Sequence, residues 1–212
     1  RPDGQQLPLS YAQQRLWFIE QLNPQADASY NIPIHLSIEG ALDIAALEYS
    51  FNQLLQRHES LRTRFVVNKD DVPNQVIEPF TAVSLPFTDL SQLPPEAKEA
   101  QASQYRQKNA QMPFDLEKGP VYHIHVVRLD SETHQLLFTI HHIAFDAWST
   151  GIFLREIVIH YLQKTTGTSL PLPQINVQYA DYTLWQQNQL TPEVLAKQLS
   201  FWREHLAHAP TT

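Results

Sequence analysis

The chain has 212 residues, of which 42% are hydrophobic and 17% are charged, as is ordinary for a globular protein with a real core. Its formal net charge of -7 argues against nucleic acid or an anionic membrane as a partner, and no basic cluster offsets that charge. The lack of cysteine excludes disulfides and thiol catalysis. No apolar run is long enough to span a bilayer, and no signal peptide opens the chain.

The first regular element is a helix that begins after an extended lead-in. Ser10 is a typical N-cap, and Gln13 stands three residues later, where a capping-box partner is expected. The apolar spacing continues to about Leu22, and Asn23 with Pro24 should end the helix.

Alternation of apolar and polar residues predicts a strand over residues 29–38, where Pro33 requires a sheet edge or a bulge. Residues 43–58 form the clearest amphipathic helix of the chain, capped by Asp43. Residues 60–67 alternate again and predict the next strand.

The middle of the chain is rich in turn residues. Short strands are expected around residues 75–78 and 83–87, followed by a polar helix over residues 95–110. Residues 121–129 and 134–142 are apolar strands joined by a short polar connection, which predicts an antiparallel hairpin.

Helices are expected to dominate the last third of the chain. Residues 147–163 are apolar nearly all round, which predicts a buried helix. A proline-rich connector over residues 168–176 leads to two further helices, over residues 179–187 and 192–206. The mixture of strands and helices indicates an α/β or α+β fold, a sheet packed by helices.

The chemistry should be centred on residues 136–150, LLFTIHHIAFDAWST. Both faces of the expected strand are largely apolar, so the strand should be central and covered on both sides. His142 should end this buried strand in line with core residues, and Asp146 should open the next helix. An imidazole and a carboxylate at such a junction are typical of an active site.

Other interpretations of these residues remain open. Asp146 alone could be only an N-cap, and His142 alone could be only a hydrogen-bonded core residue. His123 and His125 share one strand face, so a metal site with His141 and His142 is conceivable, although no cysteine and no helical HxxxH pattern supports it.

Four segments, taken in order, resemble the condensation domain of nonribosomal peptide synthetases. Residues 10–19 (SYAQQRLWFI) resemble its first core motif, and residues 57–65 (RHESLRTRF) resemble the second. Residues 140–149 (IHHIAFDAWS) resemble the third, the HHxxxDG active-site motif, and residues 179–185 (YADYTLW) resemble the fourth. Any one of these matches alone is weak, but all four in the family's order make a specific signal.

The resemblance implies a lobe like that of chloramphenicol acetyltransferase, a two-layer sandwich whose mixed sheet is covered by helices. The family domain is about twice as long and has two lobes, with the active site in a tunnel between them. Residues 1–167 therefore resemble the N-terminal lobe, and residues 168–212 resemble a connector and helices leading to a second lobe outside this chain. Ala147 stands where the family usually has glycine, which could narrow the tunnel.

The resemblance also implies a reaction. A donor acyl or peptidyl group is carried as a thioester on the phosphopantetheine arm of one carrier protein, and the amine of an acceptor on a second carrier attacks it. His142 would orient or deprotonate that amine. Free backbone amides near Ala147 and Trp148 would bind the oxyanion.

The other motif residues should be structural. Asp146 is expected to cap its helix and to pair with Arg62, or less favourably with Arg15, so that breaking the buried pair would cost roughly 3–5 kcal/mol. Arg62 by itself would be interpreted as a solvated strand residue. His141 should pack and hydrogen-bond on the opposite side from His142, and Trp148 should pack beneath the loop.

The motif sequences resemble those of domains that join an L-configured donor to an L-configured acceptor. Such domains act in the biosynthesis of secondary metabolites such as antibiotics. The expected partners are donor and acceptor carrier proteins, the second lobe and a downstream adenylation domain, with no cofactor bound by this chain and a cytoplasmic location. Two alternatives remain: epimerisation of a carrier-bound residue by the same histidine, and a noncatalytic module that only docks carriers.

Overall fold

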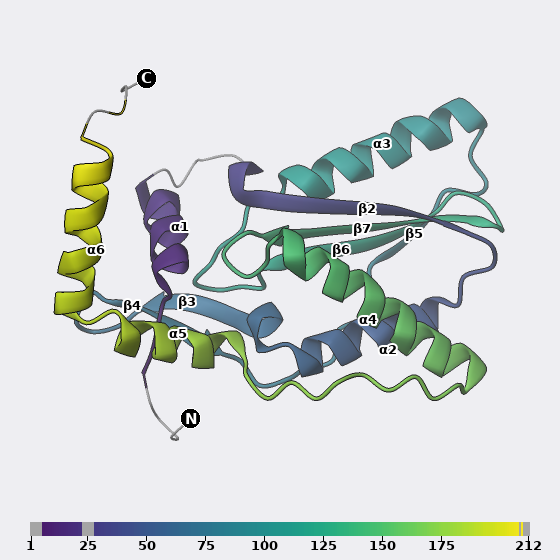
Figure 1. The fold of residues 1–212 in the computed structure, drawn as a ribbon. Coiled ribbons are helices and arrows are strands. Elements are labelled where there is room, and N and C mark those ends of the chain that lie inside the picture. The colour runs from purple at the N-terminus through teal and green to yellow at the C-terminus, as the bar shows by residue number, and fades with distance from the viewer. Residues whose placement is uncertain (1–5, 23–27, 208, 210–212) are drawn as a thin grey trace.

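The computed structural model describes residues 6–22, 28–207 and 209 (Figure 1). Its strands form two sheets, one of four strands in the order β2-β7-β6-β5 and one of three in the order β1-β4-β3. In the larger sheet β2 (Asn31–Glu39), β7 (Thr133–His141) and β6 (Tyr122–Arg128) are antiparallel, and β5 (Phe87–Asp89) runs parallel to β6. The sheet is therefore mixed, and β7 is central, as predicted.

The predicted hairpin is confirmed by the pairing of β6 with β7, and β2 lies at the edge of the sheet. An edge position explains how the sheet tolerates Pro33, which has no amide hydrogen to donate. The side chains of β2 alternate between half-buried and exposed. Ile32 and Ile34 pack against the core, while His35 lies on the opposite face.

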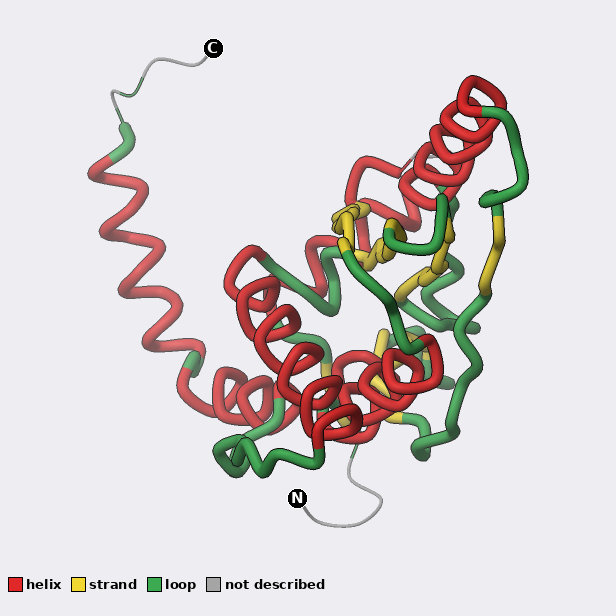
Figure 2. Tube along the Cα trace, turned by 90° about the vertical axis from the view of Figure 1, so that its right-hand side faces the viewer, coloured by secondary structure: helices red, strands yellow, loops and turns green. Residues whose placement is uncertain are grey.

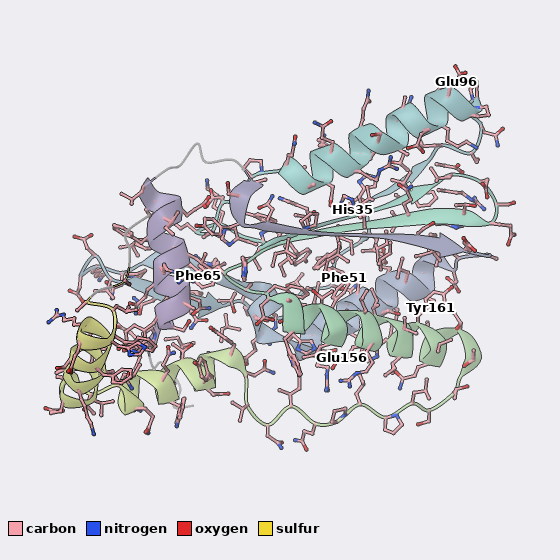
Figure 3. All side chains as sticks on the ribbon, turned by 45° about the horizontal axis from the view of Figure 1, so that its top comes forward. His35, Phe51, Phe65, Glu96, Glu156 and Tyr161 are labelled. Atoms are coloured by element: carbon pink, nitrogen blue, oxygen red, sulfur yellow. The ribbon has the colours of Figure 1, made fainter. Side chains whose placement is uncertain are left out.

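Helices α2 (Ile44–Arg57) and α4 (Ala147–Thr166) cover one face of the four-stranded sheet (Figures 1 and 3). Phe138 of β7 stacks on Phe153 of α4 with 4.4 Å between ring centroids, and Phe51 of α2 meets Phe138 edge-on at 6.0 Å. All three rings are buried, so this aromatic cluster fixes the helices on the strand that leads to the candidate site.

Helix α3 (Pro95–Gln111) covers the opposite face. Ala102 packs with Val127 and Leu137 in a separate buried cluster, and Thr139 donates a hydrogen bond to Asn109 at 2.7 Å. The predicted mixed sheet covered by helices is thus confirmed. This part of the fold has three layers where we expected two, because helices lie on both faces.

The smaller sheet joins β1 (Leu7–Pro8), β4 (Pro73–Ile77) and β3 (Thr63–Val67). A short 3-10 helix, η2 (Glu59–Arg62), occupies the residues where we expected the strand to start, and residues 83–86 are irregular rather than a strand. The lead-in strand β1 was not predicted.

Helix α1 (Tyr11–Leu22) joins the two sheets through a second core. Its capping box is confirmed. The backbone amide of Gln13 donates to the Ser10 hydroxyl at 3.2 Å, and the backbone amide of Ser10 donates to the side-chain oxygen of Gln13 at 2.9 Å. Leu16 and Phe65 are buried together in this core. The predicted helix stop at Asn23 and Pro24 lies outside the described residues.

After α4 an irregular connector leads to α5 (Tyr179–Gln189), which packs on β1, and then to α6 (Pro192–His205). No residue of α6 is buried, and the helix projects away from the rest of the molecule (Figure 2). A further 3-10 turn, η1 (Ala28–Tyr30), precedes β2. Among the described residues, none of the helices combines the length and the apolar character needed to cross a membrane.

The predicted positions of α1 to α6 are confirmed, but the expected burial of α4 is wrong in part. Phe153 and Ile157 are buried, whereas Trp148 is 83% exposed and Val158 is 53% exposed. The reason is that α4 packs against the sheet and α2 on one side only, so its outer face meets solvent.

Candidate active site

A cleft of about 340 Å³ lies beside the turn that joins β7 to α4. Its walls come from α1, η1, η2, the turn itself and the starts of α4 and α5. They are formed by Ala12, Gln13, Arg15, Leu16, Tyr30, Ser60, His142, Ile143, Ala144, Phe145, Asp146, Ser149 and Tyr179. Each of the four motif segments found in the sequence therefore contributes to one cleft, although residues 10–19 and 179–185 are separated by most of the chain.

His142 is the first residue beyond β7. Its backbone amide donates to the carbonyl oxygen of Tyr30 at 2.8 Å, which fixes the start of the turn. Its side chain is exposed and lines the cleft. The expectation that His142 lies in line with the core is wrong, because the strand ends at His141 and the turn directs the next residue out of the sheet.

His141 occupies the opposite environment, with 2% of its surface exposed. The backbone amide of Ile143 donates to its Nδ1 at 3.1 Å, which requires the proton of the neutral ring to be on Nε2. Nε2 lies 3.8 Å from a carboxylate oxygen of Glu20 and makes no hydrogen bond within the part of the chain that the structure describes. Burial, with a smaller effect of charge on His142, lowers the pKa of His141 to about 4. This histidine is therefore neutral at pH 7 and packed away from the cleft, as expected for a structural residue.

Asp146 is the N-cap of α4, which was one of the two roles considered for it. Its carboxylate accepts from the Ser149 amide at 2.8 Å and from the Ser149 hydroxyl at 2.7 Å. These hydrogen bonds, led by that of the hydroxyl, lower the pKa of Asp146, and charge on His142 adds to the effect. The side chain is exposed rather than buried.

The expected ion pair between Asp146 and Arg62 is wrong. The Arg62 guanidinium donates to the carbonyl oxygen of Leu55 at 3.2 Å and to that of Glu78, which holds it in a separate pocket. Arg15 is exposed and lines the same cleft as Asp146. No ion pair with Asp146 occurs among the described residues, because the helix start already supplies its donors.

Ala147 is the first residue of α4 and is exposed, as is Trp148. The expectation that Trp148 packs beneath the loop is wrong, since 83% of its surface is exposed on the first turn of α4. The expected oxyanion donors are also compromised, because the Trp148 amide already interacts with the Asp146 carboxylate.

A buried polar network behind the cleft was not predicted. The side-chain amide nitrogen of Gln13 donates to the side-chain oxygen of Gln75 at 3.3 Å and approaches the carbonyl oxygen of Ile143 at 3.5 Å. Ser10 and Tyr179 share a hydrogen bond of 2.9 Å between their hydroxyl groups. The network connects the first and fourth motifs to the histidine turn. In the sequence Gln13 is recognisable only as a capping-box residue, and its burial, which makes the network possible, is seen in the structure alone.

A second feature missed from the sequence is an ionic cluster around Glu156 of α4 (Figure 3). Its carboxylate accepts from His58 Nε2 at 2.6 Å and from Arg57 Nε at 3.1 Å. Burial acts to raise the pKa of Glu156, but the hydrogen bonds and charges of His58 and Arg57 outweigh it and lower the pKa. The Arg57 guanidinium also donates to the carbonyl oxygen of Pro173, so the cluster holds the connector against α2 and α4.

The histidines considered for a metal site have other partners. His123 stacks on Phe114 at 4.3 Å, and His125 Nε2 shares a hydrogen bond with Thr88 at 2.9 Å. Within the described ranges, no group of three or more His, Cys, Asp or Glu side chains is arranged to hold a metal ion.

Comparison with known proteins identifies the family. The model of the condensation domain family matches residues 4–212. The chain belongs to the condensation domain family. It is 44% identical over 200 residues to one of the linear gramicidin synthase proteins of Brevibacillus parabrevis, covering 94% of this chain and 4% of that protein. It is 37% identical over 211 residues to the phosphinothricin tripeptide synthetase PhsC of Streptomyces viridochromogenes, covering 99% of this chain and 19% of that protein.

Solved structures show the same fold. The X-domain in its complex with OxyB from teicoplanin biosynthesis matches with a TM-score of 0.84 at 26% identity, over 99% of this chain and 45% of that one. The starter condensation domain of rhizomide synthetase matches with a TM-score of 0.85 at 24% identity, over 98% and 49%. This chain thus spans about half of these solved chains and less than a fifth of the two synthetases.

Proposed function

We propose that this condensation domain takes part in peptide-bond formation in nonribosomal peptide synthesis. It would transfer a donor acyl or peptidyl group from a carrier-protein thioester to the amine of an acceptor aminoacyl thioester. The observation that carries the proposal is the convergence of all four motif segments on the cleft that holds the exposed His142.

The reaction balances without an added cofactor. The acceptor amine nitrogen attacks the donor carbonyl carbon, a C–N bond forms, and the C–S bond breaks. The acceptor nitrogen loses one proton, and the donor arm leaves as a thiol that takes up one proton. The thioester is already activated, so holding the two groups together in the correct orientation supplies much of the rate.

His142 is the residue proposed to act on the amine. Its imidazole is exposed in the cleft, where it can accept a hydrogen bond from the acceptor amine and take the proton lost from it. His141 cannot share this role, because its Nδ1 is occupied by Ile143 and its ring is buried. Asp146 stabilises the start of α4 and hence the turn that carries His142.

The proposal includes partners outside this chain. Residues 1–167 would be the N-terminal lobe and residues 168–212 the connector and helices leading to a second lobe that completes the cleft. Donor and acceptor carrier proteins would deliver substrates on phosphopantetheine arms, a downstream adenylation domain would select the acceptor, and the chain itself would bind no cofactor. The proposed location is the cytoplasm, and the proposed stereochemical class joins L-donor to L-acceptor.

The test is a condensation assay on this chain together with its second lobe. Donor and acceptor carriers loaded with L-aminoacyl groups are mixed with the protein, and each carrier is analysed by intact mass spectrometry. Dipeptide on the acceptor carrier supports the proposal. Inversion at the α-carbon of a carrier-bound residue without dipeptide would replace it with epimerisation.

A noncatalytic docking module is a second candidate, favoured by one feature of the surface. Trp148 is 83% exposed on the first turn of α4, and exposed tryptophan is common in binding surfaces. The X-domain that shares this fold was solved in complex with another protein, OxyB. Carrier binding that survives without any dipeptide product, and that is weakened by Trp148→Ala, would favour docking over catalysis.

A further inference from the structure

We infer that a small cavity adjoining the His142 cleft, lined mainly by apolar residues, is a subsite for the branched aliphatic side chain of an aminoacyl substrate. The cavity has a volume of about 80 Å³ and lies beneath the first turns of α4. This inference rests on the proposed condensation function and specifies which substrates the same site accepts.

The cavity and the cleft share part of their walls. Ser60, Ala144, Phe145 and Ser149 line both, so a group bound beside His142 can extend between η2 and the start of α4 into the smaller cavity. An aminoacyl group has this shape, because its side chain branches from the carbon next to the reacting carbonyl or amine. The reacting atoms can therefore remain near His142 while the side chain occupies the cavity.

The walls of the cavity are suited to hydrocarbon. Beyond the shared residues the lining consists of Leu54, Leu61, Ile152 and Phe153, together with His58. Burial of apolar surface favours binding, so an aliphatic side chain gains free energy on entering.

Three polar side chains line the cavity, those of His58, Ser60 and Ser149, and two of them are already paired. His58 Nε2 is hydrogen-bonded to Glu156 at 2.6 Å, and the Ser149 hydroxyl donates to Asp146 at 2.7 Å. The lining holds no carboxylate, lysine or arginine, so a charged substrate side chain would lose hydration without gaining an ion pair there, which disfavours acidic and basic amino acids.

The volume sets an upper limit on size. An apolar cavity of about 150 Å³ holds benzene, and the cavity here is about half as large. A valine or leucine side chain can enter, whereas an aromatic ring cannot. One methylene group in such a pocket changes discrimination by about 10-fold to 200-fold.

Ile152 is the residue to vary, because it is half-buried on α4 and lines the cavity. Ile152→Phe fills the cavity and Ile152→Ala enlarges it. The matched controls are Ile159→Phe and Ile159→Ala, since Ile159 is half-buried on the same helix two turns away and does not line the cavity.

The experiment measures kcat/KM for dipeptide formation by this chain with its second lobe. In one arm the donor carrier is loaded with glycine, valine, leucine, phenylalanine or aspartate while the acceptor carries glycine. In the other arm the acceptor is varied and the donor is glycine. In one arm we expect kcat/KM for valine or leucine to exceed that for phenylalanine and aspartate by about 10-fold or more. That arm shows whether the donor or the acceptor side chain occupies the cavity.

In that arm Ile152→Phe should reduce the advantage of leucine over glycine at least about 10-fold. Ile152→Ala should improve the use of phenylalanine, and both Ile159 variants should behave like the parent protein. If dipeptide forms but the Ile152 variants leave the side-chain preference unchanged in both arms, the subsite is refuted and the proposed function stands. If no dipeptide forms with any of these substrates, both proposals fail.

Discussion

The backbone amide of Ile143 donates a hydrogen bond to Nδ1 of His141 at 3.1 Å, and this contact separates the roles of two adjacent histidines. This hydrogen bond closes the turn after β7 on the buried ring of His141. His142, which lies between the two bonded residues, is left exposed in the cleft. The pair therefore consists of one residue that holds the turn and one that faces the substrate space.

The buried state of His141 predicts a dependence of stability on pH. Its pKa is lowered to about 4 in the folded protein, from 6.5 in an unfolded chain. Between these values only the unfolded state binds the proton, so stability falls as the pH falls from 6.5 to 4 and is unaffected by this group above 6.5. The full effect is about 3 kcal/mol.

Urea unfolding of the parent protein and His141→Asn, at a series of pH values, measures this effect. Asparagine keeps an acceptor for the Ile143 amide but does not titrate, so the variant should lose less stability between pH 7 and pH 4 than the parent does. Equal losses in the two proteins over this range would show that His141 does not remain neutral in the fold.

Replacing the Asp146 cap should have a modest cost. Asp146→Ala removes the acceptor for the Ser149 amide and should lower the free energy of unfolding by about 1 kcal/mol, since loss of an N-cap costs roughly 0.5–2 kcal/mol. The larger cost expected for a buried ion pair does not apply, because Asp146 is exposed. Chemical denaturation should show that Asp146→Ser, which retains a capping oxygen, restores most of the loss. A loss from Asp146→Ala as large as that of a broken buried ion pair would contradict this assignment.

The Glu156 cluster should be a larger source of stability. Glu156→Gln removes the charge that Arg57 and His58 face, and the cost should approach the roughly 3–5 kcal/mol of a broken buried ion pair. Arg57 and His58 keep partial access to water, which places the expected value below that range.

Acid titration gives a second measure of the same cluster. The pKa of Glu156 is lowered from 4.5, so its contribution is present above that pH and is lost as the pH falls below it. The Gln variant should lack this loss in urea unfolding between pH 5 and pH 3. Glu193→Gln, on the exposed helix α6, is the matched control and should change stability little.

Exposure of Trp148 leads to a contrasting expectation. Trp148→Ala should change the free energy of unfolding by no more than about 0.5 kcal/mol, as is usual for surface substitutions. Phe153→Ala, in the buried aromatic cluster of the same helix, should cost about 3–5 kcal/mol. Thermal or urea unfolding measures both losses. Similar losses in the free energy of unfolding for the two variants would contradict the structure.

Local patterns in the sequence predicted most of the elements. The amphipathic spacing of residues 44–57, the Ser10 and Gln13 capping box and the apolar strands around the hairpin each depend on neighbours a few residues away. The site could be located because its motif residues occur at short spacing around His142.

Contacts between distant segments could not be predicted in the same way. Arg62 was expected to face Asp146, but the backbone carbonyls of Leu55 and Glu78 hold it elsewhere. The outer face of α4 is apolar in sequence yet exposed, because spacing alone does not reveal which sides of a helix are covered. The Glu156 cluster joins residues about one hundred positions apart, and nothing local to either segment indicates it.

The most direct test of the central claim is the condensation assay on His142→Ala and the parent, each with its second lobe and loaded L-aminoacyl carriers. We predict that the variant keeps the unfolding free energy of the parent, because His142 is exposed, and loses at least about 100-fold in the rate of dipeptide formation. A folded His142→Ala protein that forms dipeptide at the parent rate would contradict the account.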